Sequence, residues 1–188
     1  NATCPAQLKE RLKHFASRKA MDIDHMGPAV IEQLVESGRV KNFSDLYALK
    51  HEEVAGLERL AEKSAQNLID AIEQSKSAGL ARLLFGLGVR HVGQRAASIL
   101  AKTFRSIQVL KETSFEDMES VMEIGPVIAA SLKNFLDQEN NVQDIKSLTS
   151  SGIVMEEQEV MQAEGSVLTG KQFVLTGTLS RFSRDEAK

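Results

Sequence analysis

The sequence predicts an all-α domain over residues 21–152, made of two pairs of helical hairpins. Apolar residues recur at helical spacing through the first 150 positions, as at Ile23, Met26 and Val30. Glycine falls between these helical stretches, and tyrosine and tryptophan, which favour strands, are almost absent. The most informative observation is an internal repeat, because a repeated segment points to a repeated structural unit.

Four segments of the chain share one frame of apolar and small residues. They are IDHMGPAVIEQL (23–34), LERLAEKSAQNL (57–68), VRHVGQRAASIL (89–100) and VMEIGPVIAASL (121–132). In each, an apolar residue opens the segment, a second apolar residue precedes a Gly or Ala, and a Leu closes it seven positions after the small residue. The small residues are Gly27, Ala61, Gly93 and Gly125, separated by 34, 32 and 32 residues. This frame predicts four hairpins, each with a second helix that starts at the small residue.

A longer period indicates that the hairpins are paired. The stretch NFSDLYALKHEEVAGL (42–57) resembles SIQVLKETSFEDMESV (106–121), displaced by 64 residues. Within these stretches Ser44 and Ser114 are expected to cap helix starts. Two pairs of hairpins would then make one compact domain.

The start of each second helix predicts a site for anions. The first N–H groups of a helix have no partner within it, and the helix dipole adds partial positive charge there. Without a large side chain at the small residue, a phosphate oxygen can approach the backbone. Four such sites would hold the DNA backbone whatever its base sequence. The alternative is a protein-interaction module in which the small residues only let helices pack closely.

Charge and composition limit the other functions. The net charge is -3, but residues 1–105 carry 16 Lys and Arg against 12 Asp and Glu, whereas residues 106–188 carry 7 against 14. The first part can therefore hold a modest basic surface. No apolar run approaches the ~20 residues of a membrane helix, and the single cysteine, Cys4, cannot form an internal disulfide. We expect a cytoplasmic protein with no membrane partner.

Gly-rich phosphate loops, HExxH and nucleophile elbows are missing from the sequence. The glycines of GLGVRHVG (86–93) follow no predicted strand, so this segment is not expected to bind a dinucleotide. No catalytic residue is therefore predicted in this chain.

Four longer stretches resemble bacterial NAD-dependent DNA ligase. They are CPAQLKERLKHFASRKAMDIDHMG (4–27), GLERLAEKSAQNL (56–68), LLFGLGVRHVGQRAA (83–97) and GKQFVLTGTLSRFSRDEAK (170–188). Their order resembles the ligase region that runs from the end of the zinc finger, through four helix-hairpin-helix units, into the BRCT domain. The resemblance implies four parts. They are the end of the zinc-finger segment with a connecting helix (1–20), the tandem helix-hairpin-helix domain (21–152), an acidic linker (153–169) and the truncated start of an α/β BRCT domain (170–188).

The resemblance also implies a function for the parent protein. In such ligases a lysine in a KxDG motif takes AMP from NAD and passes it to the 5′ phosphate at a nick, which the 3′ hydroxyl then attacks with magnesium present. The 188 residues contain no KxDG motif, so the chain itself is expected to be an inactive fragment that binds no cofactor. Its expected role is to hold the minor-groove side of nicked double-stranded DNA as a monomer, at the bacterial nucleoid, in replication and repair. The resemblance also assigns Cys4 to zinc, as the last of four cysteine ligands, in the intact protein only.

Ten residues make up the predicted DNA-binding set. They are Gly27, Arg59, Ala61, Lys63, Arg90, His91, Gly93, Gln94, Arg95 and Gly125. The third hairpin has the strongest cationic cluster and is predicted to bind best. The second has a methyl group at Ala61, which Arg59 and Lys63 are expected to offset. Glu123 should repel phosphate unless it points away, so the fourth hairpin is expected to be structural or to bind only through its backbone.

The hairpins depart from the common helix-hairpin-helix pattern two positions before the small residue. That pattern has glycine there, whereas this chain has His25, Arg59, His91 and Glu123. Other repair proteins carry one or two such hairpins. The alternative function is therefore a DNA-binding or protein-interaction module of another DNA repair protein.

Overall fold

The computed structural model describes residues 4–58 and 60–157. Within these ranges the fold is helical, with one isolated β-bridge and no strand, which confirms the all-α class. The predicted BRCT start at 170–188, and the predicted linker from residue 158 onward, lie outside the described residues. The described residues fall in one compact unit, which ends at residue 158. No helix in this described part is both long and apolar enough to cross a membrane.

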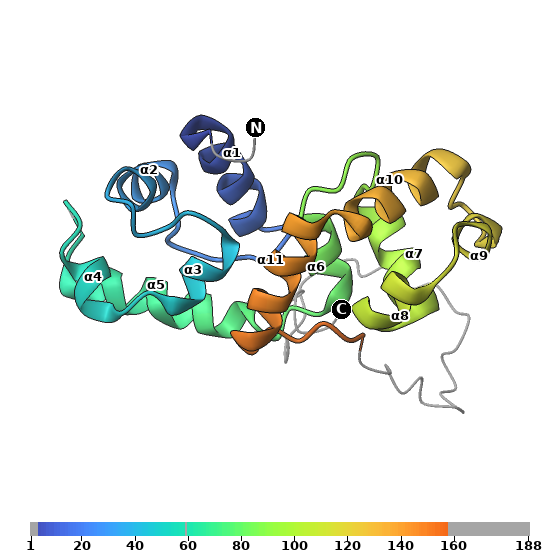
Figure 1. The fold of residues 1–188 in the computed structure, drawn as a ribbon. Coiled ribbons are helices and arrows are strands. Elements are labelled where there is room, and N and C mark those ends of the chain that lie inside the picture. Colours follow the sequence, from blue (N-terminus) through green and yellow to red (C-terminus); the bar gives the residue numbers. More distant parts are fainter. Residues whose placement is uncertain (1–3, 59, 158–188) are drawn as a thin grey trace, which may run out of the picture. The chain divides into compact units, whose positions relative to one another are not determined.

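Eleven helices make up the described part of the chain (Figure 1). They are α1 (Pro5–Ala16), α2 (Pro28–Glu36), α3 (Phe43–Ala48), α4 (His51–Ala55), α5 (Glu62–Ser75), α6 (Leu80–Gly86), α7 (Gln94–Phe104), α8 (Ile107–Glu112), α9 (Phe115–Ser120), α10 (Pro126–Asp137) and α11 (Glu139–Ser150). Most are short, as the close spacing of the repeated segments requires.

Four pairs of sequential helices pack together as hairpins. Hairpin 1 is α1 on α2, hairpin 2 is α4 on α5, hairpin 3 is α6 on α7 and hairpin 4 is α9 on α10. The short helix α3 connects hairpins 1 and 2 and packs on α5. Its counterpart α8 connects hairpins 3 and 4 and packs on α7 and α10. The predicted pairing of the hairpins is therefore present in the fold.

The repeated apolar frame forms the core. The four leucines that close the segments, Leu34, Leu68, Leu100 and Leu132, are fully buried. So are the residues three positions before them, which are Ile31, Ala65, Ala97 and Ala129. Each repeat thus supplies one helical stripe of apolar side chains to a shared interior, and this burial stabilises the hairpins.

The connecting helices show the 64-residue period in their caps. Asn42 begins α3 and Ser106 begins α8, and each side chain accepts a hydrogen bond from the backbone N–H three residues later. Ser114 caps α9 as predicted. The expectation for Ser44 is wrong, because Ser44 lies inside α3 and its hydroxyl donates to the Asn42 side chain. Asn42 is the better cap here since its oxygen reaches the Asp45 N–H at 3.0 Å.

The helical unit extends beyond the predicted 21–152 boundaries. At its start, α1 lies within the predicted 1–20 segment and forms half of hairpin 1. At its end, Ile153 and Met155 are buried. The N–H of Val154 donates to the carbonyl of Lys76, and the N–H of Ile107 donates to the carbonyl of Met155. The first residues of the predicted linker therefore pack on the helices, because their alternating apolar side chains find a surface that only the folded chain provides.

Tyr47 gives a direct probe of this core. Its hydroxyl lies 3.1 Å from the hydroxyl of buried Ser75, whose own proton is donated to the Ile72 carbonyl. Burial raises the pKa of Tyr47 to about 12, against a smaller lowering effect of the Ser75 hydrogen bond. Tyr47 is the single tyrosine of a chain without tryptophan, so its ionisation can be followed alone.

We expect the tyrosinate absorbance of the folded chain to rise well above pH 10 rather than at it. The folded-state pKa exceeds that of the unfolded chain, so the folded state retains its proton longer. This contribution to stability is complete below pH 10 and is lost as the pH rises towards about 12. A spectrophotometric titration in urea supplies the unfolded control. A midpoint equal to that control would contradict the burial of Tyr47.

Candidate nucleic-acid interface

The four small residues of the repeat occupy one and the same structural position. Gly27, Ala61, Gly93 and Gly125 are the N-caps of α2, α5, α7 and α10, and we call them the cap residues. Their φ angles lie between -72° and -79° and their ψ angles between 155° and 176°. Each cap carbonyl accepts a hydrogen bond from the N–H four residues later, at 2.9–3.1 Å. The repeat in the sequence is therefore a repeat in backbone geometry.

The N–H groups that follow the cap residues are available to a ligand. In α7 the N–H groups of Gly93, Gln94 and Arg95 have no hydrogen-bond partner among the described residues. No cap residue uses its own side chain to satisfy them. Because these donors also lie at the positive end of the helix dipole, they favour an anion.

The hairpins differ in how many donors they offer. Hairpins 1 and 4 have proline, which carries no N–H, directly after the cap residue, at Pro28 and Pro126. Hairpins 2 and 3 have Glu62 and Gln94 there instead. One more backbone donor is thus available in hairpins 2 and 3 than in hairpins 1 and 4. The predicted ranking of hairpin 3 above the others stays a prediction.

The three cap glycines are not required by packing inside the chain. A Cβ atom built on Gly27, Gly93 or Gly125 would meet no atom of the described chain within 4 Å. Their φ angles are also ordinary for any residue. The alternative in which these residues serve close helix packing is therefore not supported at these positions, where the space beside the backbone is open.

At the three described positions two residues before a cap residue, the backbone has the left-handed conformation that favours glycine. The φ angles are 65° at His25, 65° at His91 and 70° at Glu123. A non-glycine residue in this region costs about 1–2 kcal/mol. The chain thus keeps the conformation of the common motif without its glycine, and three polar side chains stand exposed beside the caps. The equivalent Arg59 lies outside the described residues.

Hairpin 3 gathers exposed cationic side chains. Arg90, His91 and Gln94 are exposed around Gly93, as is Arg95, whose side chain is 80% exposed. Sequence reasoning missed Lys102, seven residues after Arg95 on α7. Lys102 is exposed, forms no ion pair within the described residues and lines the same hollow as Arg95. Two turns of helix separate the two residues, which is the pattern that would have indicated a shared face.

Arg95 is not free, however, because it pairs with Glu123 of hairpin 4. Arg95 Nε lies 2.5 Å from Glu123 Oε2, and Arg95 Nη2 donates to Glu123 Oε1 at 2.7 Å. Glu123 raises the pKa of Arg95 through this hydrogen bond, and Arg95 lowers the pKa of Glu123 in turn. Glu123 was expected to repel phosphate and Arg95 to bind phosphate. In the structure the two side chains bind each other.

Hairpins 1 and 2 are joined by hydrogen bonds between a side-chain amide and the backbone. The side-chain amide of Gln33 accepts from the N–H of Glu58 at 2.7 Å and donates to its carbonyl at 3.2 Å. The cap residue Ala61 is exposed, and so is Lys63, which has no ion pair among the described residues. Lys63 therefore remains a candidate contact for a phosphate at this cap.

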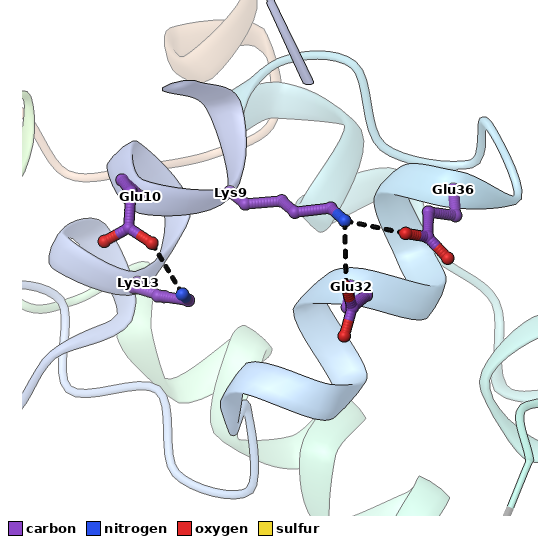
Figure 2. A network of polar contacts seen from close by, with 5 residues as sticks. All are labelled: Lys9, Glu10, Lys13, Glu32 and Glu36. Carbon is purple, nitrogen blue, oxygen red and sulfur yellow. Dashed lines mark hydrogen bonds and ion pairs between the residues drawn. The ribbon is translucent and has the colours of Figure 1, made fainter. Parts of the chain in front are cut away.

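Two lysines of α1 in hairpin 1 form ion pairs within the hairpin, as Figure 2 shows. Lys9 on α1 reaches across to α2, with its Nζ 3.1 Å from a carboxylate oxygen of Glu32 and 2.7 Å from one of Glu36. On α1 itself, Lys13 pairs with Glu10 at 2.6 Å. The two Lys9 ion pairs join α1 to α2, whereas the Lys13 pair lies within α1. The N–H groups of Gly27 and Ala29 remain available at this cap.

Two family models match the chain. The "SAM-like Helix-hairpin-helix tandem" family matches residues 17–74, and the "Helix-hairpin-helix motif" family matches residues 82–145. Each match holds two of the four cap residues. The described chain therefore consists of tandem helix-hairpin-helix motifs, as the sequence predicted.

Several bacterial DNA ligases are similar to this chain over nearly all of its length. A DNA ligase of Pelotomaculum thermopropionicum is 50% identical over 100% of this chain, and one of Carboxydothermus hydrogenoformans is 47% identical over 100%. A DNA ligase of Hahella chejuensis is 46% identical over 98%. The resemblance to bacterial DNA ligase is confirmed. The chain spans about a quarter of the length of these DNA ligases, 27–28%.

Cys4 is the residue that the DNA ligase resemblance assigned to zinc. It is the N-cap of α1 and a free thiol, and hydrogen bonds from the backbone N–H groups of Gln7 and Ala6 lower its pKa. A lower pKa favours the thiolate, which is the form that binds zinc. No group of three or more His, Cys, Asp or Glu side chains suited to a metal occurs among the described residues. Cys4 alone therefore does not make a site, and its role in zinc binding stays a prediction.

Proposed function

We propose that this helical unit is the DNA-binding part of a DNA ligase and holds the backbone of duplex DNA without reading its sequence. The observation that carries the proposal is the set of four cap residues. They share one backbone conformation, and the three glycines among them have open space where a side chain would lie. A phosphate oxygen fits that space and the N–H groups behind it.

Contacts of this kind position DNA but do not specify it. Phosphates are alike at every step of a duplex, so hairpins that bind phosphate follow the backbone of any sequence. A ligase must join strands whatever bases flank the break, and a sequence-blind grip suits that task. We place the contacts on the minor-groove side of the nicked duplex, where paired hairpins can follow both strands. The proposed contacts include the cap residues and the side chains of Arg59, Lys63, Arg90, His91, Gln94 and Arg95.

The parent protein would supply the chemistry. We propose that it seals 5′-phosphate/3′-hydroxyl nicks in replication and repair, using NAD as the AMP donor, magnesium for the transfer steps and zinc as a structural metal. The adenylated lysine of that reaction needs a KxDG motif, which these 188 residues do not contain. The chain by itself is therefore proposed to bind DNA but to be inactive in ligation. We place the parent in the bacterial cytoplasm at the nucleoid, as a monomer.

Binding to fluorescent duplexes of two unrelated sequences, intact and nicked, tests the proposal. We expect similar affinities for both sequences and a fall in affinity with salt. If about three phosphates are neutralised, log K against log [salt] should have a slope of about -3. Replacing Lys63 or Arg90 by Gln should each reduce that slope by about 0.9.

The matched control is Lys146→Gln, which removes one exposed positive charge from α11, outside the hairpins. This change should leave the slope nearly unaltered. Absence of binding at low salt, or binding to one of the two sequences only, would refute the proposed function.

A further inference from the structure

Arg95 and Glu123 connect hairpin 3 to hairpin 4. Arg95 is the second residue of α7, two positions after Gly93, and Glu123 lies two positions before Gly125. Among the described residues, theirs is the one ion pair between these two hairpins. A single carboxylate therefore reaches from the cap of hairpin 4 to the cap of hairpin 3.

The geometry of this pair is that of an arginine bound to an oxyanion. Two oxygens of one carboxylate face two N–H groups on one edge of the guanidinium, at 2.5 and 2.7 Å. A phosphate presents two oxygens to arginine in the same side-by-side manner. Glu123 and a DNA phosphate are therefore alternative occupants of the same guanidinium edge.

The surroundings allow one occupant to replace the other. The pair borders an open hollow of about 450 Å³ that is lined by Gln94, Ser98, Ile99 and Lys102 as well. The Arg95 side chain is 80% exposed and the Glu123 side chain 43% exposed. Ion pairs so accessible to water are weak and are screened by salt. Lys102 lines the same hollow and adds a second positive charge there, which a neighbouring phosphate of the same backbone could meet.

We propose that Glu123 is an internal competitor for Arg95, so that hairpin 3 binds DNA by exchanging the Glu123 carboxylate for a phosphate. The inference rests on the proposed function and adds to it a residue that lowers affinity. Glu123 reduces the positive charge of the strongest hairpin until a phosphate arrives. The ion pair between the two hairpins is then broken at the moment when hairpin 3 binds the DNA backbone, while α8 keeps both hairpins packed together.

A double-mutant cycle on the 188-residue chain tests the exchange. Glu123→Gln keeps the side-chain shape and removes the charge, and both residues are accessible, so the fold should persist. We expect this variant to bind an intact duplex about three- to ten-fold more tightly, with a salt slope steeper by about 0.9. In an Arg95→Met background the same change should give almost no gain, because no guanidinium is left to be freed.

The control for charge alone is Glu119→Gln, in the same hairpin, where an exposed carboxylate on α9 has no ion pair among the described residues. It should change affinity by less than half as much as Glu123→Gln. If Glu123→Gln matches this control, or if its gain survives in the Arg95→Met background, the exchange is wrong while DNA binding stands. If the parent chain binds no duplex at all, the proposed function fails first and the inference with it.

Discussion

Replacing Gly93 by Leu is expected to weaken binding of duplex DNA by about ten-fold or more, because a hydrogen bond to a charged group contributes ~1.5–3 kcal/mol. The leucine side chain would project into the open space at the cap of α7 and keep a phosphate from the N–H groups of Gly93, Gln94 and Arg95. The variant should still fold, because a Cβ atom at this position meets no atom of the described chain within 4 Å. The φ angle of -78° suits any residue, and loss of a favourable N-cap costs about 0.5–2 kcal/mol.

Gly86 provides the matched control within the same hairpin. A Cβ at Gly86 would lie 3.3 Å from the Phe15 ring and 3.4 Å from Ala20, so Gly86→Leu should overpack the core and lower the free energy of unfolding by about 1–3 kcal/mol. Urea unfolding and DNA titration of both variants separate the two roles. A folded Gly93→Leu chain that binds DNA as well as the parent would contradict the backbone site.

Replacing Leu100 by Ala is expected to lower the free energy of unfolding by about 2–5 kcal/mol. Leu100 closes the repeat in hairpin 3 and is fully buried. It lies on α7, the helix that packs on α6. Truncation would leave a cavity in addition to the lost burial of the side chain. Since a domain of this size is stable by only about 5–15 kcal/mol, the loss should be visible as an early urea transition.

Val109→Ala is the control for this second variant. Val109 lies on α8 and is 46% exposed, so its truncation should change the free energy of unfolding by no more than about 0.5 kcal/mol. Equal unfolding midpoints for the two variants would show that the closing leucine of the repeat does not stabilise the hairpin.

The sequence predicted the parts of the fold that depend on local periodicity. The four cap residues and the four closing leucines were identified from their spacing alone, and all eight occupy the expected caps and core positions. Periodicity succeeds here because one supersecondary unit is used four times, so each copy confirms the register of the others. The departure at His25, His91 and Glu123 was also visible, but its backbone conformation was not.

Contacts between segments that are distant in the chain could not be predicted from the sequence. Glu123 was identified as a threat to phosphate binding, but its partner Arg95 lies 28 residues away, and no local pattern joins them. The same holds for Lys102 and for residues 153–157, whose surroundings exist only after the hairpins have packed. The predicted DNA contacts themselves stay predictions.

The helix α11 packs on both α3 and α10 and so helps to fix the distance between the two pairs of hairpins. In the first pair of hairpins α11 contacts the connecting helix α3, and in the second pair it contacts α10. A second contact between the two pairs is made by α1 and α6. The separation of the two pairs of caps is therefore fixed by side-chain packing rather than by a tether. The interval between phosphates along a duplex is also fixed. Under the proposed function, a change in how α11 packs would therefore shift the caps relative to the phosphates even if every cap stayed intact.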